Sequence, residues 1–364
     1  MEELGLTLFN NVFFGRRVLL TGHTGFKGSW LALWLQELGA TVTGIALTPE
    51  TTPNHWDLLG IGAEDRRVDI RDASAVLAAV VEIQPEIVFH LAAQALVRRS
   101  YREPLETWST NVMGTANILE ACRLVKSVRA IIVITTDKCY ENHEWPWGYR
   151  ENDRLGGHDP YSASKAGAEF VSASYRKTYF NTPEAPLLAT ARAGNVVGGG
   201  DWSEDRLVPD LVRAVSAHQS LEIRSPNAVR PWQHVLESLS GYLMLGQRLL
   251  AGKREYAQAW NFGPGPESNL SVAEILDVLN SRWPGMQWHI SEKPQPHEAT
   301  LLYLDSSKAR SLLKWQPVWR IDQTLAVTVE WYRAWLEHRQ VESRRQLAAY
   351  IDAAAQCEAA WLDE

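Results

Sequence analysis

The sequence predicts an α/β protein with a doubly wound parallel sheet and a smaller α/β lobe at its C-terminal end. Short β-branched runs alternate with amphipathic helical stretches over roughly the first 195 residues, which is typical of βαβ units. A glycine-rich turn directly follows the first of these runs. With 364 residues, the chain is long enough for two domains or for one large unit with an appended lobe.

The predicted elements alternate regularly in the first half of the chain. The buried run Arg17–Thr21 predicts a strand, and the helix after it spans 28–38 and ends at Gly39, a residue type that commonly closes helices. Asp72 is a typical N-cap for a helix that stops before Pro85. Further strands are predicted at 41–47, 87–91, 129–136 and 187–193, and further helices at about 104–124 and 161–179.

The second half of the chain has a different pattern. After about Asn195 the alternation weakens, and loops rich in glycine and proline separate short strands from isolated helices such as 272–282. We therefore expect a main Rossmann-type domain over 1–195, a lobe over 196–325 whose segments interleave with it, and a helical, solvated extension over 326–364.

Composition excludes several classes of protein. The net charge is −7, from 36 basic and 43 acidic residues, so no overall positive field is present to bind nucleic acid. Cys122, Cys139 and Cys357 lie far apart, which argues against a disulfide framework and a metal site and fits a reducing compartment. No apolar run is long enough to span a membrane, and 1–15 does not resemble a secretion signal. We expect a cytoplasmic protein with no metal and no nucleic acid or membrane partner.

The glycine-rich turn predicts a dinucleotide site. Gly22 turns the chain, Gly25 lets backbone N–H groups approach a pyrophosphate, and Gly28 lets the next helix pack closely on the strand. The helix N-terminus adds unpaired N–H donors and a partial positive charge. The candidate cofactor-binding residues here are Gly22, His23, Thr24, Gly25, Phe26, Lys27 and Gly28; His23 and Lys27 either touch the cofactor or face solvent.

The second predicted strand does not distinguish NAD from NADP. No acidic residue follows it before Glu50, and no arginine or lysine lies between 44 and 53 to pair with a 2′-phosphate. Asp69 and Ile70, after the third strand, are candidates to contact the adenine end of the cofactor. Asp69 is equally well explained as an ordinary acid at the end of a strand.

A second motif, Tyr161-x-x-x-Lys165, predicts a catalytic base. Positions four residues apart share one helix face. Tyrosine ionises at about pH 10, so it needs a nearby lysine and a cationic nicotinamide to act as a base at neutral pH. Taken alone, the pair is also compatible with an ordinary surface helix.

A third motif, Thr135 to Lys138, closes the strand predicted at 129–136. Ligands of open parallel sheets bind beyond the carboxyl ends of the strands, so Thr136 is placed to contact a substrate hydroxyl. Asp137 and Lys138 add an acid and an amine at the same place, which is more than hydride transfer alone requires. The alternative is an N-cap aspartate beside a solvated lysine.

Together these motifs resemble the extended short-chain dehydrogenase/reductase family, and within it the nucleotide-sugar 4,6-dehydratases. The resemblance spans roughly residues 17 to 325. It is closest to the CDP-glucose branch, because Asp137-Lys138 replaces the Asp-Glu pair of most dTDP-glucose enzymes. Further matching motifs are His90-Leu91-Ala92-Ala93-Gln94, Asn111-Val112-x-Gly114-Thr115, Arg192-x-Gly194-Asn195-Val196, Gly198–Trp202 and Arg230–Val235.

The resemblance implies a hydro-lyase that uses NAD as a recycled cofactor in deoxysugar biosynthesis, such as that of O-antigen lipopolysaccharide. C4 of CDP-glucose is oxidised with Tyr161 as base, water leaves across C5 and C6 with Asp137 and Lys138 as acid and base in either order, and the hydride returns to C6. Catalytic candidates are thus Thr136, Asp137, Lys138, Tyr161 and Lys165. Further cofactor candidates are Asp69, Ile70, Leu91, Ala92, Ala93, Asn111, Thr135, Tyr161 and Lys165. Substrate candidates are Gln94, Thr136, Asn195, Arg206, Arg230 and His297.

The resemblance also implies a homodimer formed through the helices at 104–124 and 161–179. Several other activities remain open at this point. They are a dTDP-glucose or UDP-N-acetylhexosamine 4,6-dehydratase, a nucleotide-sugar 4-epimerase, and a dinucleotide sensor without catalysis.

Overall fold

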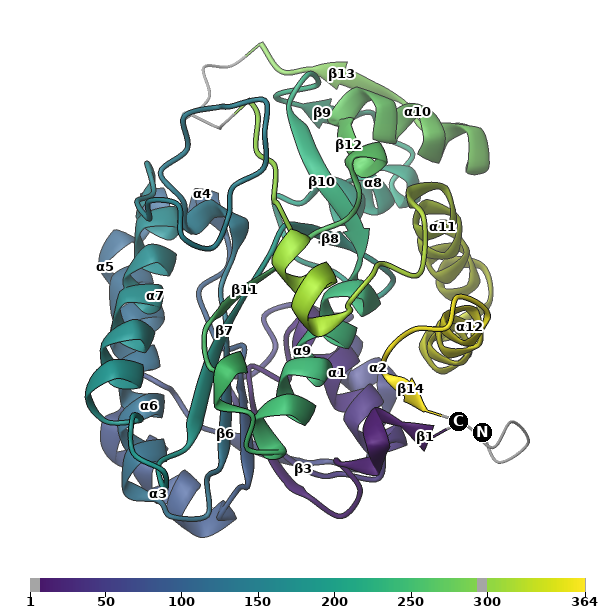
Figure 1. Cartoon of the computed structure of the whole chain (residues 1–364). Coiled ribbons are helices and arrows are strands. Elements are labelled where there is room, and N and C mark those ends of the chain that lie inside the picture. The colour runs from purple at the N-terminus through teal and green to yellow at the C-terminus, as the bar shows by residue number, and fades with distance from the viewer. Residues whose placement is uncertain (1–6, 293–299, 364) are drawn as a thin grey trace.

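A seven-stranded parallel sheet forms the centre of the molecule in the computed structural model, which describes residues 7–292 and 300–363 (Figure 1). The predicted fold class is confirmed. The strands lie in the order β11 (Ala259–Phe262), β7 (Leu187–Ala193), β6 (Ala130–Ile134), β5 (Ile87–His90), β2 (Arg17–Thr21), β3 (Thr41–Ala46) and β4 (Glu64–Arg67).

Helices cover both faces of this sheet (Figure 1). One face carries α3 (Ala73–Ile83), α6 (Gly114–Leu124) and α7 (Pro160–Thr178), and the other carries α1 (Phe26–Glu37) and α9 (Val235–Leu250). Asp72 caps α3 as predicted, since its side chain accepts from the N–H groups of Ser74 and Ala75. Shorter elements are η1 (Phe9–Asn11), α2 (His55–Leu59), α4 (Val97–Arg102) and η3 (Asp137–Cys139).

The helix predicted at 104–124 is present but not uniform. It consists of α5 (Pro104–Trp108), a π-helical turn η2 (Ser109–Met113) and α6. The π-helical turn buries Asn111 against the loop after β5. Such turns often occur at functional sites.

The lobe lies over the carboxyl ends of the central strands (Figure 1). A sheet of β12 (Asn269–Ser271), β10 (Val229–His234) and β8 (Asn195–Val197) forms its centre, and β13 (Trp288–Ile290) pairs with β9 (Leu221–Ile223) beside it. Its other elements are α8 (Leu207–Ser216), η4 (Arg254–Tyr256), η5 (Pro266–Ser268), α10 (Val272–Arg282) and η6 (Ala309–Leu313). Because α9 and β11 return to the main sheet, segments of the two parts alternate along the chain. The division at residue 195 stays a prediction.

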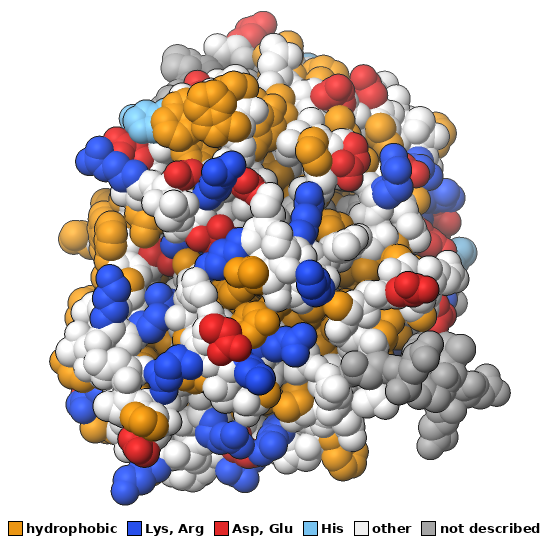
Figure 2. All heavy atoms as spheres, in the orientation of Figure 1, with side chains coloured by type: hydrophobic (Ala, Val, Ile, Leu, Met, Phe, Trp, Pro, Cys, Tyr) orange, Lys and Arg blue, Asp and Glu red, His pale blue; other side chains and the backbone are white. Residues whose placement is uncertain are grey.

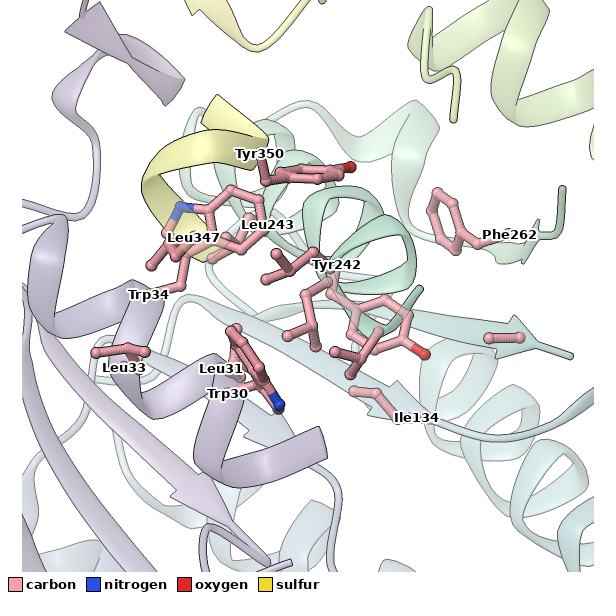
Figure 3. Packing of buried hydrophobic residues seen from close by; sticks show 14 of the residues in the cluster. Trp30, Leu31, Leu33, Trp34, Ile134, Tyr242, Leu243, Phe262, Leu347 and Tyr350 are labelled. Atoms are coloured by element: carbon pink, nitrogen blue, oxygen red, sulfur yellow. The ribbon is translucent and has the colours of Figure 1, made fainter. Parts of the chain in front are cut away.

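The C-terminal segment is helical as predicted but not solvated, so that expectation was wrong. α11 (Ile321–His338) and α12 (Ser343–Gln356) pack on the main body, and the final strand β14 (Leu362–Asp363) pairs with β1 (Thr7–Leu8). Figure 3 shows Leu347 and Tyr350 of α12 beside Trp34 of α1. Tyr350 is fully buried against Trp34 of α1. This packing removes the apolar surface of both rings from water.

No helix in the described part of the chain is long and apolar enough to cross a membrane.

Candidate active site

A cavity of about 1590 Å³ opens at the carboxyl ends of β2, β5, β6 and β7, between the sheet and the lobe. This is the position where open parallel sheets bind their ligands. Pockets for a single small ligand usually measure about 300–1,000 Å³, so this cavity is large enough for a dinucleotide and a second ligand together.

The glycine-rich turn forms one end of the cavity, and its geometry fits a pyrophosphate. Gly22 has a φ of +74°, and a Cβ on Gly28 would lie 2.1 Å from the Gly22 carbonyl oxygen, so neither position accepts a side chain. Gly25 is the N-cap of α1, and no side chain caps this helix. The N–H groups of its first turn are therefore available to an anion.

His23 and Lys27 do not face solvent, contrary to one of the two sequence interpretations. His23 is fully buried and does not line the cavity; its Nε2 lies 2.8 Å from Oδ1 of Asp65, and its ring packs edge-on against Trp56. Burial lowers the pKa of His23. Its side chain therefore holds β4 to the turn. Lys27 lines the cavity, and its Nζ donates to the Tyr242 hydroxyl at 3.3 Å.

Other residues predicted to bind the cofactor also line the cavity. Thr24, Phe26, Asp69, Ile70, Leu91, Ala92 and Ala93 are among its walls. The Asp69 carboxylate is paired with Arg71 at 2.6 Å, which lowers the pKa of Asp69. Asp69 is thus a cavity residue that already has a cationic partner.

Four of the five catalytic candidates line the same cavity: Thr136, Lys138, Tyr161 and Lys165. Tyr161 and Lys165 lie one turn apart near the start of α7, whose N-cap Asp159 accepts from the Ser162 N–H. The Lys165 ammonium donates to the Ile134 carbonyl at 3.3 Å, at the end of β6. The tyrosine–lysine pair of α7 therefore meets the Thr136–Lys138 motif, as the sequence predicted.

Asp137 is fully buried and does not line the cavity, which differs from its neighbours. Its Oδ1 accepts from the Thr136 hydroxyl at 3.0 Å and from Lys138 Nζ at 3.4 Å. Its Oδ2 has no hydrogen-bond partner among the described residues. A Cβ on Gly194 would come within 3.2 Å of this oxygen, so the glycine of the Arg192–Val196 motif leaves space for it.

Burial dominates the ionisation of the two α7 residues. It raises the pKa of the Tyr161 phenol to about 12, an effect that the Thr136 hydroxyl and Arg206 partly offset. It lowers the pKa of Lys165 to about 8. With only the groups of the chain around it, Tyr161 is a neutral phenol, and an added positive charge in the cavity is needed to make it a base.

The substrate candidates divide into two groups. Asn195, Arg206 and Arg230 line the cavity; Asn195 accepts from Lys138 Nζ at 3.3 Å, and Arg206 donates to Asp201 at 3.0 Å. Arg230 donates to the Val229 carbonyl at 2.8 Å. His297 lies outside the described residues.

The side chains of Gln94 and Asn111 form hydrogen bonds to other protein groups. The Gln94 side-chain amide donates to the Leu96 carbonyl and the Thr107 hydroxyl, and its oxygen accepts from the Leu96 N–H, although the residue borders the cavity. Asn111 is not a cavity residue: its amide binds the backbone of Gln94 and donates to Ser164 Oγ at 2.8 Å. The prediction of a cofactor contact by the Asn111 side chain is therefore not supported, and the residue joins η2 to α7.

Comparison with known proteins agrees with this geometry. The family model described as GDP-mannose 4,6 dehydratase matches residues 19–328. The chain belongs to this family. The resemblance inferred from the motifs is thus confirmed.

Two curated relatives match most of the chain. CDP-glucose 4,6-dehydratase of Salmonella typhimurium is 46% identical over 352 residues, which cover 94% of this chain and 98% of that enzyme. dTDP-glucose 4,6-dehydratase of Xanthomonas campestris pv. campestris is 26% identical and covers 86% and 92%.

Solved structures of similar proteins share the fold of this chain. DesIV of Streptomyces venezuelae, a dTDP-glucose 4,6-dehydratase with NAD and TYD bound, superposes with a TM-score of 0.74, 26% identity, and coverage of 89% of this chain and 98% of its own. The epimerase Mth375 of Methanothermobacter thermautotrophicus, at 24% identity, shares the fold with a TM-score of 0.80, covering 93% and 96%.

One buried residue that supports the site, Glu169, was not predicted from the sequence. Glu169 is buried on α7 and accepts from the Thr135 hydroxyl at 2.6 Å, the Thr190 hydroxyl at 2.8 Å and the Arg192 guanidinium at 2.8 and 2.9 Å. Thr135 therefore points its hydroxyl to Glu169. Four-residue spacing from Tyr161 through Lys165 to Glu169 was the signal that this residue shares their helix face.

Proposed function

We propose that this protein dehydrates CDP-glucose to CDP-4-keto-6-deoxyglucose, with NAD as a recycled cofactor. The 46% identity with a CDP-glucose 4,6-dehydratase over 94% of the chain supports the substrate. One structural observation carries the chemistry: Tyr161, Lys165, Thr136 and Lys138 line one cavity, and Lys138 Nζ donates to the buried carboxylate of Asp137 at 3.4 Å. An acid–amine pair beside a tyrosine suits an elimination in addition to hydride transfer.

The cofactor is NAD. The related structure of DesIV has NAD bound, and the glycine-rich turn of this chain fits a pyrophosphate. Gly22, residues 24–28, Asp69, Ile70 and 91–93 would hold the dinucleotide along the cavity. When bound, NAD accepts a hydride from the sugar and later returns it.

The residues of α7 and β6 carry the first step. Tyr161 takes the proton of the C4 hydroxyl while the C4 hydrogen leaves as hydride, and Thr136 hydrogen-bonds the same oxygen. Lys165 is one helical turn away and stabilises the phenolate by its charge. The result is a ketone at C4, which makes the hydrogen on C5 acidic.

Asp137 and Lys138 carry the elimination. Lys138, as a free amine, removes the C5 proton, and Asp137, as a carboxylic acid, gives a proton to the C6 oxygen, which leaves as water. The C6 oxygen would reach the buried Asp137 Oδ2 on the side of Gly194, a cavity residue whose missing side chain leaves space there. The Asp137 Oδ2 atom is suited to hold that proton because it has no other partner among the described residues. After the hydride returns to C6, the Lys138 ammonium gives its proton back to C5, and the proton that Tyr161 took from the C4 hydroxyl passes through water to Asp137. The enzyme is thereby restored, and the sequence is redox-neutral. The opposite division, with Lys138 as acid and Asp137 as base, balances equally.

A substrate panel tests the proposal. Purified protein and NAD are incubated with CDP-, dTDP-, UDP- and GDP-glucose and with UDP-N-acetylglucosamine, and the 4-keto product is read by its absorbance in alkali. We expect CDP-glucose to have a kcat/KM at least tenfold above the others, and the Tyr161→Phe variant to be inactive. Preference for another sugar contradicts the substrate, an epimer without a keto product indicates a 4-epimerase, and inertness with every sugar indicates a sensor.

We further propose that the protein is a homodimer that works in the cytoplasm. Large apolar side chains are exposed along α5, η2, α6 and α7, where Leu105, Met113 and Phe170 have 83%, 56% and 59% of their surface accessible. Apolar side chains are visible at this edge of the molecule (left in Figure 2). Contiguous exposed apolar surface is typical of a protein interface. The three cysteines are free thiols, which suits a reducing compartment.

A further inference from the structure

Lys27 is placed differently from the other residues of the glycine-rich turn. It is the second residue of α1, and its side chain reaches across to α9, where Nζ donates to the Tyr242 hydroxyl at 3.3 Å. Figure 3 shows the Tyr242 hydroxyl directed away from Trp34 and Tyr350. The lysine therefore brings a cation from the turn to the wall of the catalytic cavity.

The charges around Lys27 are unbalanced. Among the described residues, no carboxylate forms an ion pair with Lys27, and the two nearby acids are already used: Asp137 pairs with Lys138 and Asp201 pairs with Arg206. The charged groups that act on Lys27 are Arg206, Lys165, Lys138 and Asp137, and Arg206 is itself paired with Asp201. The Asp137–Lys138 pair has no net charge whichever of the two holds the proton, so the cations Lys27, Lys165 and Arg206 stand against the carboxylate of Asp201.

An enclosed excess of positive charge is unfavourable unless an anion compensates it. We propose that Lys27 binds the diphosphate group of a nucleotide, adding a side-chain charge to the N–H groups of the same helical turn. Lysine suits this task as a compact charge on a flexible stem. The inference rests on the proposed function, in which the dinucleotide and the nucleotide sugar each bring a diphosphate into the cavity.

Binding through Lys27 is coupled to proton uptake. Burial, reinforced by Arg206 and Lys165, lowers the pKa of Lys27 to about 7. A diphosphate beside the ammonium raises that pKa, so the complex takes up a proton at pH 8 and takes up almost none at pH 6, where the lysine is already charged. The affinity therefore falls as the pH rises above 7, by up to tenfold per pH unit.

Calorimetric titration of the whole protein tests the proposal. NAD and CDP are titrated separately into the wild type, Lys27→Met and Lys27→Arg at pH 6 and pH 8, in two buffers that differ in ionisation enthalpy. We expect Lys27→Met to weaken at least one ligand about tenfold at pH 6 and less at pH 8, and to lower its proton uptake at pH 8. Lys27→Arg keeps the charge and regains most of the affinity at pH 6. Lys126→Met, an exposed lysine outside the cavity, is the matched control.

The two ligands identify the source of the diphosphate. Loss with NAD alone assigns Lys27 to the cofactor, loss with CDP alone assigns it to the nucleotide sugar, and loss with both assigns it to a position between them. The proposal is overturned if Lys27→Met changes both dissociation constants by less than threefold at pH 6, or if its proton uptake equals that of the wild type. Because these titrations need no turnover, they stay informative even if the substrate panel rejects CDP-glucose.

Discussion

The sequence motifs predicted which residues meet at the site, but not the direction of every side chain. The motifs correctly brought Tyr161, Lys165, Thr136 and Lys138 to one cavity. They could not tell which way a side chain turns: Asn111 and His23 point into the protein, because packing against Ser164 and Trp56 decides their direction. Lys27, which the motif treated in the same way as His23, does line the cavity.

Asp137 and Lys138 have separable roles that single-turnover kinetics can distinguish. In Asp137→Asn and Lys138→Met, we expect hydride transfer from C4 to persist while the elimination slows by 10²–10⁴-fold, the usual contribution of a general acid or base. NADH absorbance at 340 nm then accumulates in the first turnover. Tyr161→Phe is the control in which no NADH forms. If both variants turn over at the wild-type rate, the assignment is wrong.

At the scale of elements, two buried carboxylates join segments that are far apart in the sequence. Glu169 joins α7 to β6 and β7 through Thr135, Thr190 and Arg192. Glu237 joins α9 to the chain before α11 and to α12, since it accepts from the backbone N–H groups of Val318 and Trp319 and from the Tyr350 hydroxyl. Neither carboxylate was predicted, because their partners are set by the tertiary fold.

Removing the charge of Glu169 leaves Arg192 buried without a counter-charge. We expect Glu169→Gln to lower the free energy of unfolding by about 3–5 kcal/mol, the usual effect of breaking a buried ion pair on one side. The double variant Glu169→Gln/Arg192→Met removes both charges and regains much of that loss. Urea unfolding measures both. Equal stabilities of the single and double variants would show that the pair is not coupled.

Glu237 predicts a pH dependence of stability. Burial raises its pKa to about 7, above the 4.5 of an unfolded glutamate, so the folded state retains a proton that the unfolded state has released between these values. The contribution of Glu237 to stability is therefore full below pH 4.5 and is lost as the pH rises through 7. Thermal unfolding of the wild type and Glu237→Gln at pH 5.5 and 8 checks this.

We expect the difference in melting temperature between the wild type and Glu237→Gln to be larger, in favour of the wild type, at pH 5.5. A matched control is Glu274→Gln, which changes an exposed capping residue of α10. A difference that is constant across the range would mean that Glu237 ionises outside it.

Strands were predicted more reliably than helices for a physical reason. Buried strands of a parallel sheet are near-continuous apolar runs, and 187–193 was predicted with its observed bounds. α9 was missed because every residue in it except Arg248 is buried, so its sequence lacks the polar face that marks an amphipathic helix. The C-terminal extension was predicted to be solvated because the residues that bury it, such as Trp34 of α1 and Glu237 of α9 around Tyr350, lie far away in the sequence.

At the scale of the whole molecule, the exposed apolar face of α5 and α7 predicts an assembly. We expect the wild type to sediment as a dimer at micromolar concentration and Leu105→Glu/Phe170→Glu to sediment as a monomer, because charges on a buried interface are not compensated. The paired substitution Leu312→Glu/Ile290→Glu, at exposed apolar positions elsewhere, is the control. A wild type that remains monomeric would contradict the proposed dimer.

The pairing of β1 with β14 brings the two ends of the described chain together, since Thr7 lies opposite Asp363 and Phe9 stacks on Trp361. During synthesis on a ribosome, β1 emerges long before its partner strand β14. Phe9 and Trp34 can therefore be covered by Trp361 and Tyr350 only after α12 and β14 have been translated. A growing polypeptide with this topology keeps part of its core open to water until then.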